Sequence, residues 1–397
     1  MDDRVAKLAE LTVDVGANVQ SGQVVAVIAP TGAAELVRAI AERCYARGAR
    51  FVDPWIFDPY VKRARVELAT EDTLEFVPHW WEDRLLQLGE LRGSRISLNP
   101  IVPPGLLDGL DPLRAGKDRL PDVKSTFAVI NARHTNWVVV PGPTVEWARA
   151  VHPGVGDEEA LERLWQQVVH VCRLDEPDPV AAWSRRFDDL QRARDRLTEL
   201  RFDALHFEGE GTDLTVGLLP GSLWMSARME TVEGIVHAPN IPTEETSTAP
   251  DPERVDGVVR ATKPLNVAGT VVRGLRVRFE GGRAVEIEAD ENADALRARC
   301  ATDEGASRLG EVALVDRESR IGALGTVFSS TLLDENAASH LAFGNAYAIS
   351  AEEAYRDRIN QSVIHIDFMI GGDDVAVTGI ARDGSRVPVL RGGVWQI

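Results

Sequence analysis

Hydrophobic residues in the first half of the chain alternate between helical spacing and short continuous runs. Apolar side chains recur at helical spacing in residues 4–11 and 33–47, and a continuous apolar run fills residues 23–29. Such a run, entered through glycine and serine, is typical of a strand buried on both faces, as in a parallel sheet. A short apolar segment at residues 50–52 follows the second helix. The order strand, helix, strand predicts a βαβ unit and therefore an α/β domain.

The same reading extends to the end of the first half. We predict further strands at residues 95–98, 125–130 and 137–141, and helices at residues 158–172 and 180–199. A proline-rich segment at residues 175–179 separates the two helices, because proline ends a helix and restricts the residue before it.

The pattern changes after about residue 201, where short strands separated by glycine-containing turns dominate. The turn Glu280-Gly281-Gly282 is predicted to close a hairpin between strands at residues 275–279 and 284–288. An antiparallel sheet or partial barrel is the natural product of such strands. We therefore predict an α/β domain with a parallel sheet at residues 1–200, and an α+β domain rich in antiparallel strands at residues 201–397.

Composition narrows the range of partners and compartments. The chain has 397 residues, of which 44% are hydrophobic and 27% charged, and these values are ordinary for a globular protein. Its net charge of −18 opposes binding to nucleic acid and to anionic membrane surfaces. Three isolated cysteines, Cys44, Cys172 and Cys300, offer neither a disulfide framework nor a Cys-x-x-Cys site. With no secretory signal at the N-terminus, we expect a soluble cytoplasmic protein.

The most informative motif is His365-Ile366-Asp367, which lies in an apolar, β-branched segment typical of a strand. Alternate residues of a strand project from one face, so the imidazole and the carboxylate point the same way, as metal ligands do. Taken alone, such a pair is more often a hydrogen-bonded structural pair. Further candidate ligands lie upstream at His340, Glu311 and the doublet Glu244-Glu245.

Several common chemistries have no motif in this chain. The sequence holds no Gly-x-Ser-x-Gly elbow, no phosphate-binding Walker loop and no His-Glu-x-x-His helix. Carboxylate and imidazole chemistry remains, and two divalent ions need a bridging carboxylate, terminal oxygen ligands and one or two imidazoles. That inventory is supplied by Glu245, Glu311, His340, His365 and Asp367.

Each of these residues also has an ordinary structural interpretation. Glu244 and Glu245 are equally compatible with a helix cap or a solvated position, Glu311 with the start of a strand, and His340 with a hydrogen-bonded histidine on a helix.

Four segments together resemble the metallo-aminopeptidases typified by aminopeptidase T of thermophiles, a group that includes leucyl aminopeptidase and aminopeptidase S-like enzymes. The resemblance spans roughly residues 205–375 in matching order, while the first half agrees in size and style without a diagnostic motif. The segments are Glu208 to Leu214, Asn240 to Glu245 with Ala249-Pro250, Leu332 to Ala337 leading to His340 and Tyr347, and His365 to Gly371.

The resemblance implies an exopeptidase that uses two divalent ions, Zn²⁺, Co²⁺ or Mn²⁺, carried by the second domain. Its ligand set carries over onto Glu245, Glu311, His340, His365 and Asp367, with Glu311 as the bridge. The resemblance further implies short peptides as substrates and a homodimer whose N-terminal domains restrict entry to the active sites.

Two catalytic roles follow from the same resemblance. The sequence alone leaves open which of the two adjacent glutamates binds metal. Neighbours on an extended chain point in opposite directions, so one can bind metal while the other serves as a base or holds the substrate amine. We assign Glu245 to the metal and Glu244 to proton transfer or to anchoring the substrate amine. Tyr347 is expected to stabilise the oxyanion, two helical turns beyond His340 if that segment is helical, although Gly344 weakens the helical interpretation.

Two alternatives use the same residues. A mononuclear iron dioxygenase of a hydroxylated pyridine needs two imidazoles and a carboxylate, which His340, His365 and Asp367 would provide. The full set of glutamates argues against it. The other alternative is a metal-binding protein without catalytic activity.

Overall fold

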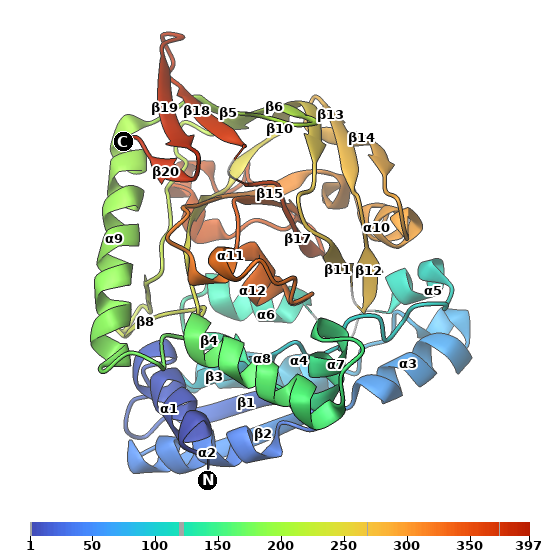
Figure 1. The fold of residues 1–397 in the computed structure, drawn as a ribbon, viewed down its shortest axis with the longest axis vertical. Coiled ribbons are helices and arrows are strands. Elements are labelled where there is room, and N and C mark those ends of the chain that lie inside the picture. The colour runs from blue at the N-terminus through green and yellow to red at the C-terminus, as the bar shows by residue number, and fades with distance from the viewer. Residues whose placement is uncertain (1, 119–122, 268, 373) are drawn as a thin grey trace.

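A parallel sheet of four strands forms the centre of the N-terminal half. The structure is a computed structural model that describes residues 2–118, 123–267, 269–372 and 374–397 (Figure 1). The strands lie in the order β2, β1, β3, β4, and each neighbouring pair is parallel. Their bounds are β1 (Val24–Pro30), β2 (Phe51–Phe57), β3 (Ser94–Asn99) and β4 (Asn136–Pro141). The prediction of an α/β unit with a buried first strand is confirmed.

Helices cover both faces of this sheet, and alternate residues of β1 point into two different cores. Val25 and Val27 pack with α1, α2 and α8, whereas Ala26 and Ile28 pack with α4 and α6. The helices of this half are α1 (Asp3–Leu11), α2 (Ala34–Ala46), α3 (Pro59–Leu68), α4 (His79–Glu90), α5 (Pro112–Lys117), α6 (Val123–Asn131), α7 (Val145–Val151) and α8 (Asp157–Val171), with a π-helical turn η1 (Thr12–Gly16) and a 3₁₀ turn η2 (Glu71–Thr73).

The strand predicted at residues 125–130 is wrong, because these residues belong to helix α6. Their apolar and β-branched side chains suggested a strand, yet β3 and β4 are parallel neighbours and need a crossover connection between them. Val129 of α6 packs beside Leu85 and Leu88 of α4 over the sheet. Tertiary packing therefore overrides the local strand preference.

Helix α9 (Pro179–Leu200) connects the two halves and runs along the left side of the molecule in Figure 1. Asp178 caps its first turn by accepting a hydrogen bond from the amide of Ala181. Trp183 and Phe187 belong to the core of the first half, and Leu197 belongs to the core of the second. The division into residues 1–200 and 201–397 remains a prediction, since Ile241 and Phe328 also pack into the first core.

The second half contains an antiparallel sheet of eight strands in the order β14, β13, β10, β6, β5, β18, β19, β20, at the top of Figure 1. Its strands are β5 (Ala204–Gly209), β6 (Thr212–Leu218), β10 (Pro250–Arg260), β13 (Arg276–Glu280), β14 (Arg283–Glu288), β18 (Ala376–Ile380), β19 (Arg386–Arg391) and β20 (Val394–Trp395). The hairpin predicted at Gly281-Gly282 joins β13 to β14, and both glycines have positive φ. The antiparallel character of this half is confirmed.

A smaller antiparallel sheet lies beneath it, in the order β17, β16, β15, β9. Its strands are β9 (Glu245–Thr248), β15 (Leu309–Val315), β16 (His340–Gly344) and β17 (His365–Met369). The remaining elements are β7 (Met229–Glu230), β8 (Val236–His237), β11 (Leu265–Val267), β12 (Thr270–Val272), α10 (Ala293–Cys300), α11 (Arg320–Leu324), α12 (Thr331–Glu335) and the 3₁₀ turns η3 (Gly305–Ser307), η4 (Ala348–Ser350) and η5 (Glu353–Tyr355). Among the described residues, every helix is too short or too polar to cross a membrane.

Candidate metal centre

The register of the small antiparallel sheet places all five predicted ligands on one face. Residues that pair directly across antiparallel strands project to the same side. Ala342 on β16 pairs with Glu311 on one side and Asp367 on the other. His340 lies two residues from Ala342 on β16, and His365 lies two residues from Asp367 on β17, so both share the face of Ala342. Glu245 pairs with Val315, which lies four residues from Glu311 on β15 and therefore also shares this face. The alternation of two residues per repeat therefore brings four strands' ligands together.

The residues between the ligands on this face are small. Ser247, Ala313, Ala342 and Gly344 share the face with the five ligands. Their short side chains leave room above the sheet. The opposite face is apolar and packs into the core of the second half through Val312, Leu314, Leu341, Phe343 and Phe368. A tightly packed core thus supports the ligands from below.

The ligand atoms form two overlapping groups that share one carboxylate. One group is Glu245, Glu311 and His340, and the other is Glu311, His365 and Asp367, with the ligand atoms of each group within 4.8 Å of one another. His340 Nε2 lies 3.1 Å from Glu245 Oε2, and His365 Nε2 lies 3.4 Å from Asp367 Oδ1 and 3.6 Å from Glu311 Oε2. Glu311 is the member common to both groups.

Backbone carbonyl groups orient the two imidazoles. His365 Nδ1 lies 2.8 Å from the carbonyl oxygen of Asn345, and His340 Nδ1 lies 3.3 Å from that of Ala338. When Nδ1–H donates to the carbonyl, Nε2 carries the free lone pair and points at the carboxylates. This second interaction is the usual way in which proteins orient a metal-binding histidine.

The electrostatics of the cluster favour bound positive charge. Burial, followed by the charge of Glu245, raises the pKa of Glu311 to about 7. Burial alone would lower the pKa of His340, but contact with Glu245 raises it to about 9. Burial would also lower the pKa of His365, but the charge of Asp367 and its hydrogen bond raise that pKa to about 10. Closely spaced carboxylates thus hold protons or cations strongly.

Glu335 is a site residue that the sequence analysis missed. It ends α12, lines the same cavity as the five ligands, and lies 3.3 Å from the side-chain amide nitrogens of both Asn240 and Asn336. Burial and then the charge of Asp367 raise its pKa well above the ordinary value. Strand alternation could not identify Glu335, because it approaches the cluster from a helix outside the sheet.

Glu244 does not reach the cluster, so this position does not fit the catalytic role predicted for it. Its side chain is fully buried, and its two carboxylate oxygens accept hydrogen bonds from Arg173 Nη1 at 2.8 Å and Arg186 Nε at 2.5 Å. Arg186 also pairs with Asp316. The physical reason is the extended chain where β9 begins: Glu245 faces the ligands, and Glu244, immediately before the strand, faces Arg173 and Arg186.

Tyr347 lines the cavity, but the predicted helical relation to His340 is wrong. His340 begins strand β16, which ends at Gly344 with φ of +94°, and Tyr347 precedes the 3₁₀ turn η4. The ring centroids of Tyr347 and His365 are 5.8 Å apart. Burial and then the charge of Glu311 raise the pKa of Tyr347 well above its ordinary value, which keeps its hydroxyl protonated as a hydrogen-bond donor.

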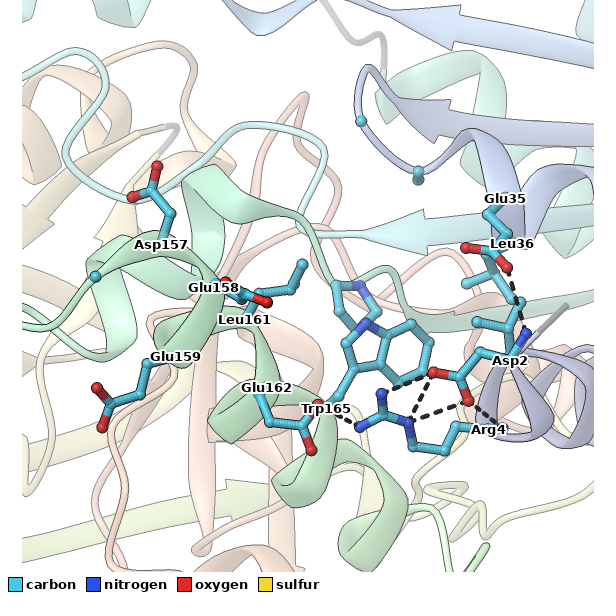
Figure 2. Close-up of a pocket in the computed structure, with 15 residues that line it drawn as sticks. Asp2, Arg4, Glu35, Leu36, Asp157, Glu158, Glu159, Leu161, Glu162 and Trp165 are labelled. Atoms are coloured by element: carbon cyan, nitrogen blue, oxygen red, sulfur yellow. Dashed lines mark hydrogen bonds and ion pairs between the residues drawn. The ribbon is translucent and has the colours of Figure 1, made fainter.

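The cavity over the cluster is small and is not the largest in the molecule. Its volume is about 60 Å³. A cavity of about 800 Å³ lies between α1, α2 and α8, where Glu158, Glu159 and Glu162 gather (Figure 2). Its one arginine, Arg4, pairs with Asp2 and Glu162, and no imidazole is among its lining residues. The ligand chemistry therefore identifies the smaller cavity as the candidate site.

Comparison with known proteins identifies the family to which the chain is similar. The family model described as thermophilic metalloprotease (M29) matches residues 1–395. The chain is 43% identical to aminopeptidase T of Thermus aquaticus, over 100% of this chain and 99% of that protein. It is 38% identical to aminopeptidase AmpS of Bacillus subtilis, over 98% and 97% of the two chains.

A solved structure is similar to this chain over its whole length. Wild-type AmpT from Thermus thermophilus superposes with a TM-score of 0.89 and 42% sequence identity, covering 99% of both chains. The family resemblance and the fold class predicted from the sequence are both confirmed.

Proposed function

Because the chain belongs to the thermophilic metalloprotease (M29) family, we propose that it is a metal-dependent aminopeptidase that releases N-terminal residues from short peptides. The observation that carries this proposal is the gathering of Glu245, Glu311, His340, His365 and Asp367 on one sheet face. A peptidase uses all five, whereas an iron dioxygenase would need only two imidazoles and one carboxylate.

We assign two divalent ions to the two overlapping ligand groups, with Glu311 between them. Mixed carboxylate and imidazole donors suit Zn²⁺, Co²⁺ and Mn²⁺. The donor set fits a cation for a second reason: Glu245 Oε2 is closed off from solvent, and its contact with His340 Nε2 at 3.1 Å lacks hydrogen-bond geometry. A buried carboxylate oxygen in that condition is costly unless a cation satisfies it.

When bound, the ions polarise the scissile carbonyl and acidify the attacking water. The residues of the chain do the rest. The hydroxyl of Tyr347 donates a hydrogen bond to the oxygen that gains negative charge. Glu335 is the carboxylate lining the cavity outside both ligand groups, so we assign to it the proton transfer to the leaving amine.

The test is chelation followed by reconstitution. The protein is dialysed against a chelator, its metal content is measured, and hydrolysis of leucine p-nitroanilide is assayed with and without added Zn²⁺, Co²⁺ or Mn²⁺. We expect activity to disappear and to return with two ions per chain. Full activity in a demonstrably metal-free sample would contradict the proposal. One ferrous ion per chain with oxygen uptake would instead support the dioxygenase.

We further propose a homodimer in the cytoplasm. The family resemblance supports the dimer, and the three buried free cysteines support a reducing compartment. Light scattering of the purified protein tests the dimer, and a monomer at micromolar concentration would contradict it.

A further inference from the structure

A second cavity shares a wall with the candidate metal centre. Its volume is about 350 Å³, against about 60 Å³ over the cluster. Four residues line both cavities: Trp137, Met225, Ser226 and Met229. The smaller cavity has room for ions, a water molecule and little else, so the body of any peptide substrate must lie outside it. The adjoining cavity is the space available for that body.

The two cavities carry opposite charge. Four arginines and one glutamate line the larger cavity, whereas four carboxylates line the smaller one. Within the described part of the chain, the exposed side chains of Arg133 and Arg356 donate to the backbone carbonyl groups of Glu230 and Ala351 and form no ion pair with a carboxylate. Arg194 and Arg228 are paired at 3.0 and 2.8 Å with Asp195 and Asp188. Positive charge that no protein carboxylate neutralises therefore remains at this cavity.

Two deeply buried side chains that line the larger cavity each have a polar atom without a hydrogen-bond partner among the described residues. Thr135 is 2% exposed and His237 is 4% exposed, and neither Thr135 Oγ1 nor His237 Nε2 has a partner among the described residues. Buried polar atoms in native proteins nearly always have a partner, so these two atoms are available to a polar ligand in this cavity. The lining also offers the indole rings of Trp137 and Trp224 to apolar parts of that ligand.

We infer that this arginine cavity binds the C-terminal carboxylate of the peptide substrate. The inference rests on the proposed aminopeptidase function and specifies its substrate class. The carboxylate cluster attracts the free amine at one end, and Arg133 and Arg356 attract the free carboxylate at the other. Because the two cavities adjoin, a short peptide is the substrate class whose free amine and free carboxylate can reach both of them.

The test compares a tripeptide with its amide. Leu-Gly-Gly and Leu-Gly-Gly-amide differ only in the terminal charge, and leucine p-nitroanilide has no carboxylate at all. For the unmodified holoenzyme, we expect kcat/KM to favour the free acid over the amide by roughly tenfold or more, the usual effect of a charge-assisted hydrogen bond. In Arg133→Gln and in Arg133→Gln/Arg356→Gln, we expect most of this preference to disappear, with p-nitroanilide hydrolysis unchanged.

Arg38→Gln is the matched control, since Arg38 is exposed on α2 and lies outside both cavities. Equal rates with acid and amide, or an unchanged preference in the double variant, would overturn the inference while leaving the aminopeptidase proposal intact. Loss of p-nitroanilide hydrolysis in the arginine variants alone would also overturn it, because the arginines would then support the fold or the metal centre. If the unmodified protein cleaved none of the three compounds, the proposed function itself would fail.

Discussion

The two faces of the small antiparallel sheet are built from the same four strands and have opposite properties. One face carries the five ligands with small residues between them, and the other is apolar and continuous with the core of the second half. Phe343 stacks on Phe368 at 5.0 Å directly behind the ligand strands. Carboxylates repel one another and can stay close together only on a rigid support. Tight packing of the apolar face therefore keeps the ligand strands in place against this repulsion.

Removing the shared carboxylate Glu311 should cause the largest loss of activity among these variants. For Glu311→Gln we expect kcat to fall by roughly 1,000-fold or more, equivalent to about 4 kcal/mol, because both ligand groups lose a member. The folded state should persist, since the apolar face is untouched. Steady-state kinetics and circular dichroism measure the two effects. Glu253→Gln, at an exposed position, is the control. A near-normal rate in Glu311→Gln would show that Glu311 is not the shared ligand.

Truncating the apolar face should reverse this pattern. Phe368→Ala removes a fully buried ring, and we expect the free energy of unfolding to fall by about 3–5 kcal/mol. The rate per folded molecule should change far less than in Glu311→Gln. Denaturant titration measures the stability, with exposed Val285→Ala as the control. If Phe368→Ala left stability unchanged but abolished activity, the division of labour between the faces would be wrong.

The adjacent residues Glu244 and Glu245 sharpen the comparison within one dipeptide. Glu244→Gln weakens the buried ion pairs that residue 244 forms with Arg173 and Arg186. We expect the free energy of unfolding to fall by about 3 kcal/mol, while the rate per folded molecule is retained. Glu245→Gln should instead lose activity and keep its stability. Thermal unfolding and kinetics of the two variants, measured side by side, test this. A catalytic defect confined to Glu244→Gln would restore the role predicted from the sequence.

The smallest effect concerns a histidine that faces no carboxylate. Burial, and the nearby charge of Arg133, lower the pKa of His237 to about 4, in contrast to the histidines of the ligand face. Below pH 6.5 the unfolded chain therefore binds more protons at this position than the folded one. The contribution of His237 to stability is complete above pH 6.5 and falls as the pH drops towards 4, by roughly 2 kcal/mol between pH 7 and pH 5.

Unfolding titrations at both pH values, with His237→Gln as the comparison, isolate this contribution. The His237→Gln variant should lose less stability between pH 7 and pH 5 than the unmodified protein. Identical pH dependence in the two proteins would contradict the assignment.

The sequence predicts what depends on neighbours along the chain. Alternation alone places His365 and Asp367 on one face, and the buried run at residues 23–29 identifies the central parallel strand. What brings Glu311 and His340 to the same face is pairing between strands more than twenty residues apart, which no local pattern encodes. Residue type alone made Glu311 and His340 candidate ligands, and the family resemblance joined them with His365 and Asp367 into one predicted site.

The errors have the same origin. Helix α6 was predicted as a strand because its composition favours strands, while the parallel crossover requires a helix there. Glu335 was missed because it approaches from α12, and Tyr347 reaches the cavity through a turn rather than along a helix.

Helix α9 gives the molecule one further property. Its first turns belong to one hydrophobic core and its last turns to the other. Neither half can therefore unfold without exposing apolar surface of this helix. Both halves should consequently unfold in a single calorimetric peak on heating. A protease that cuts within residues 179–200 should release two unstable fragments instead of two folded domains.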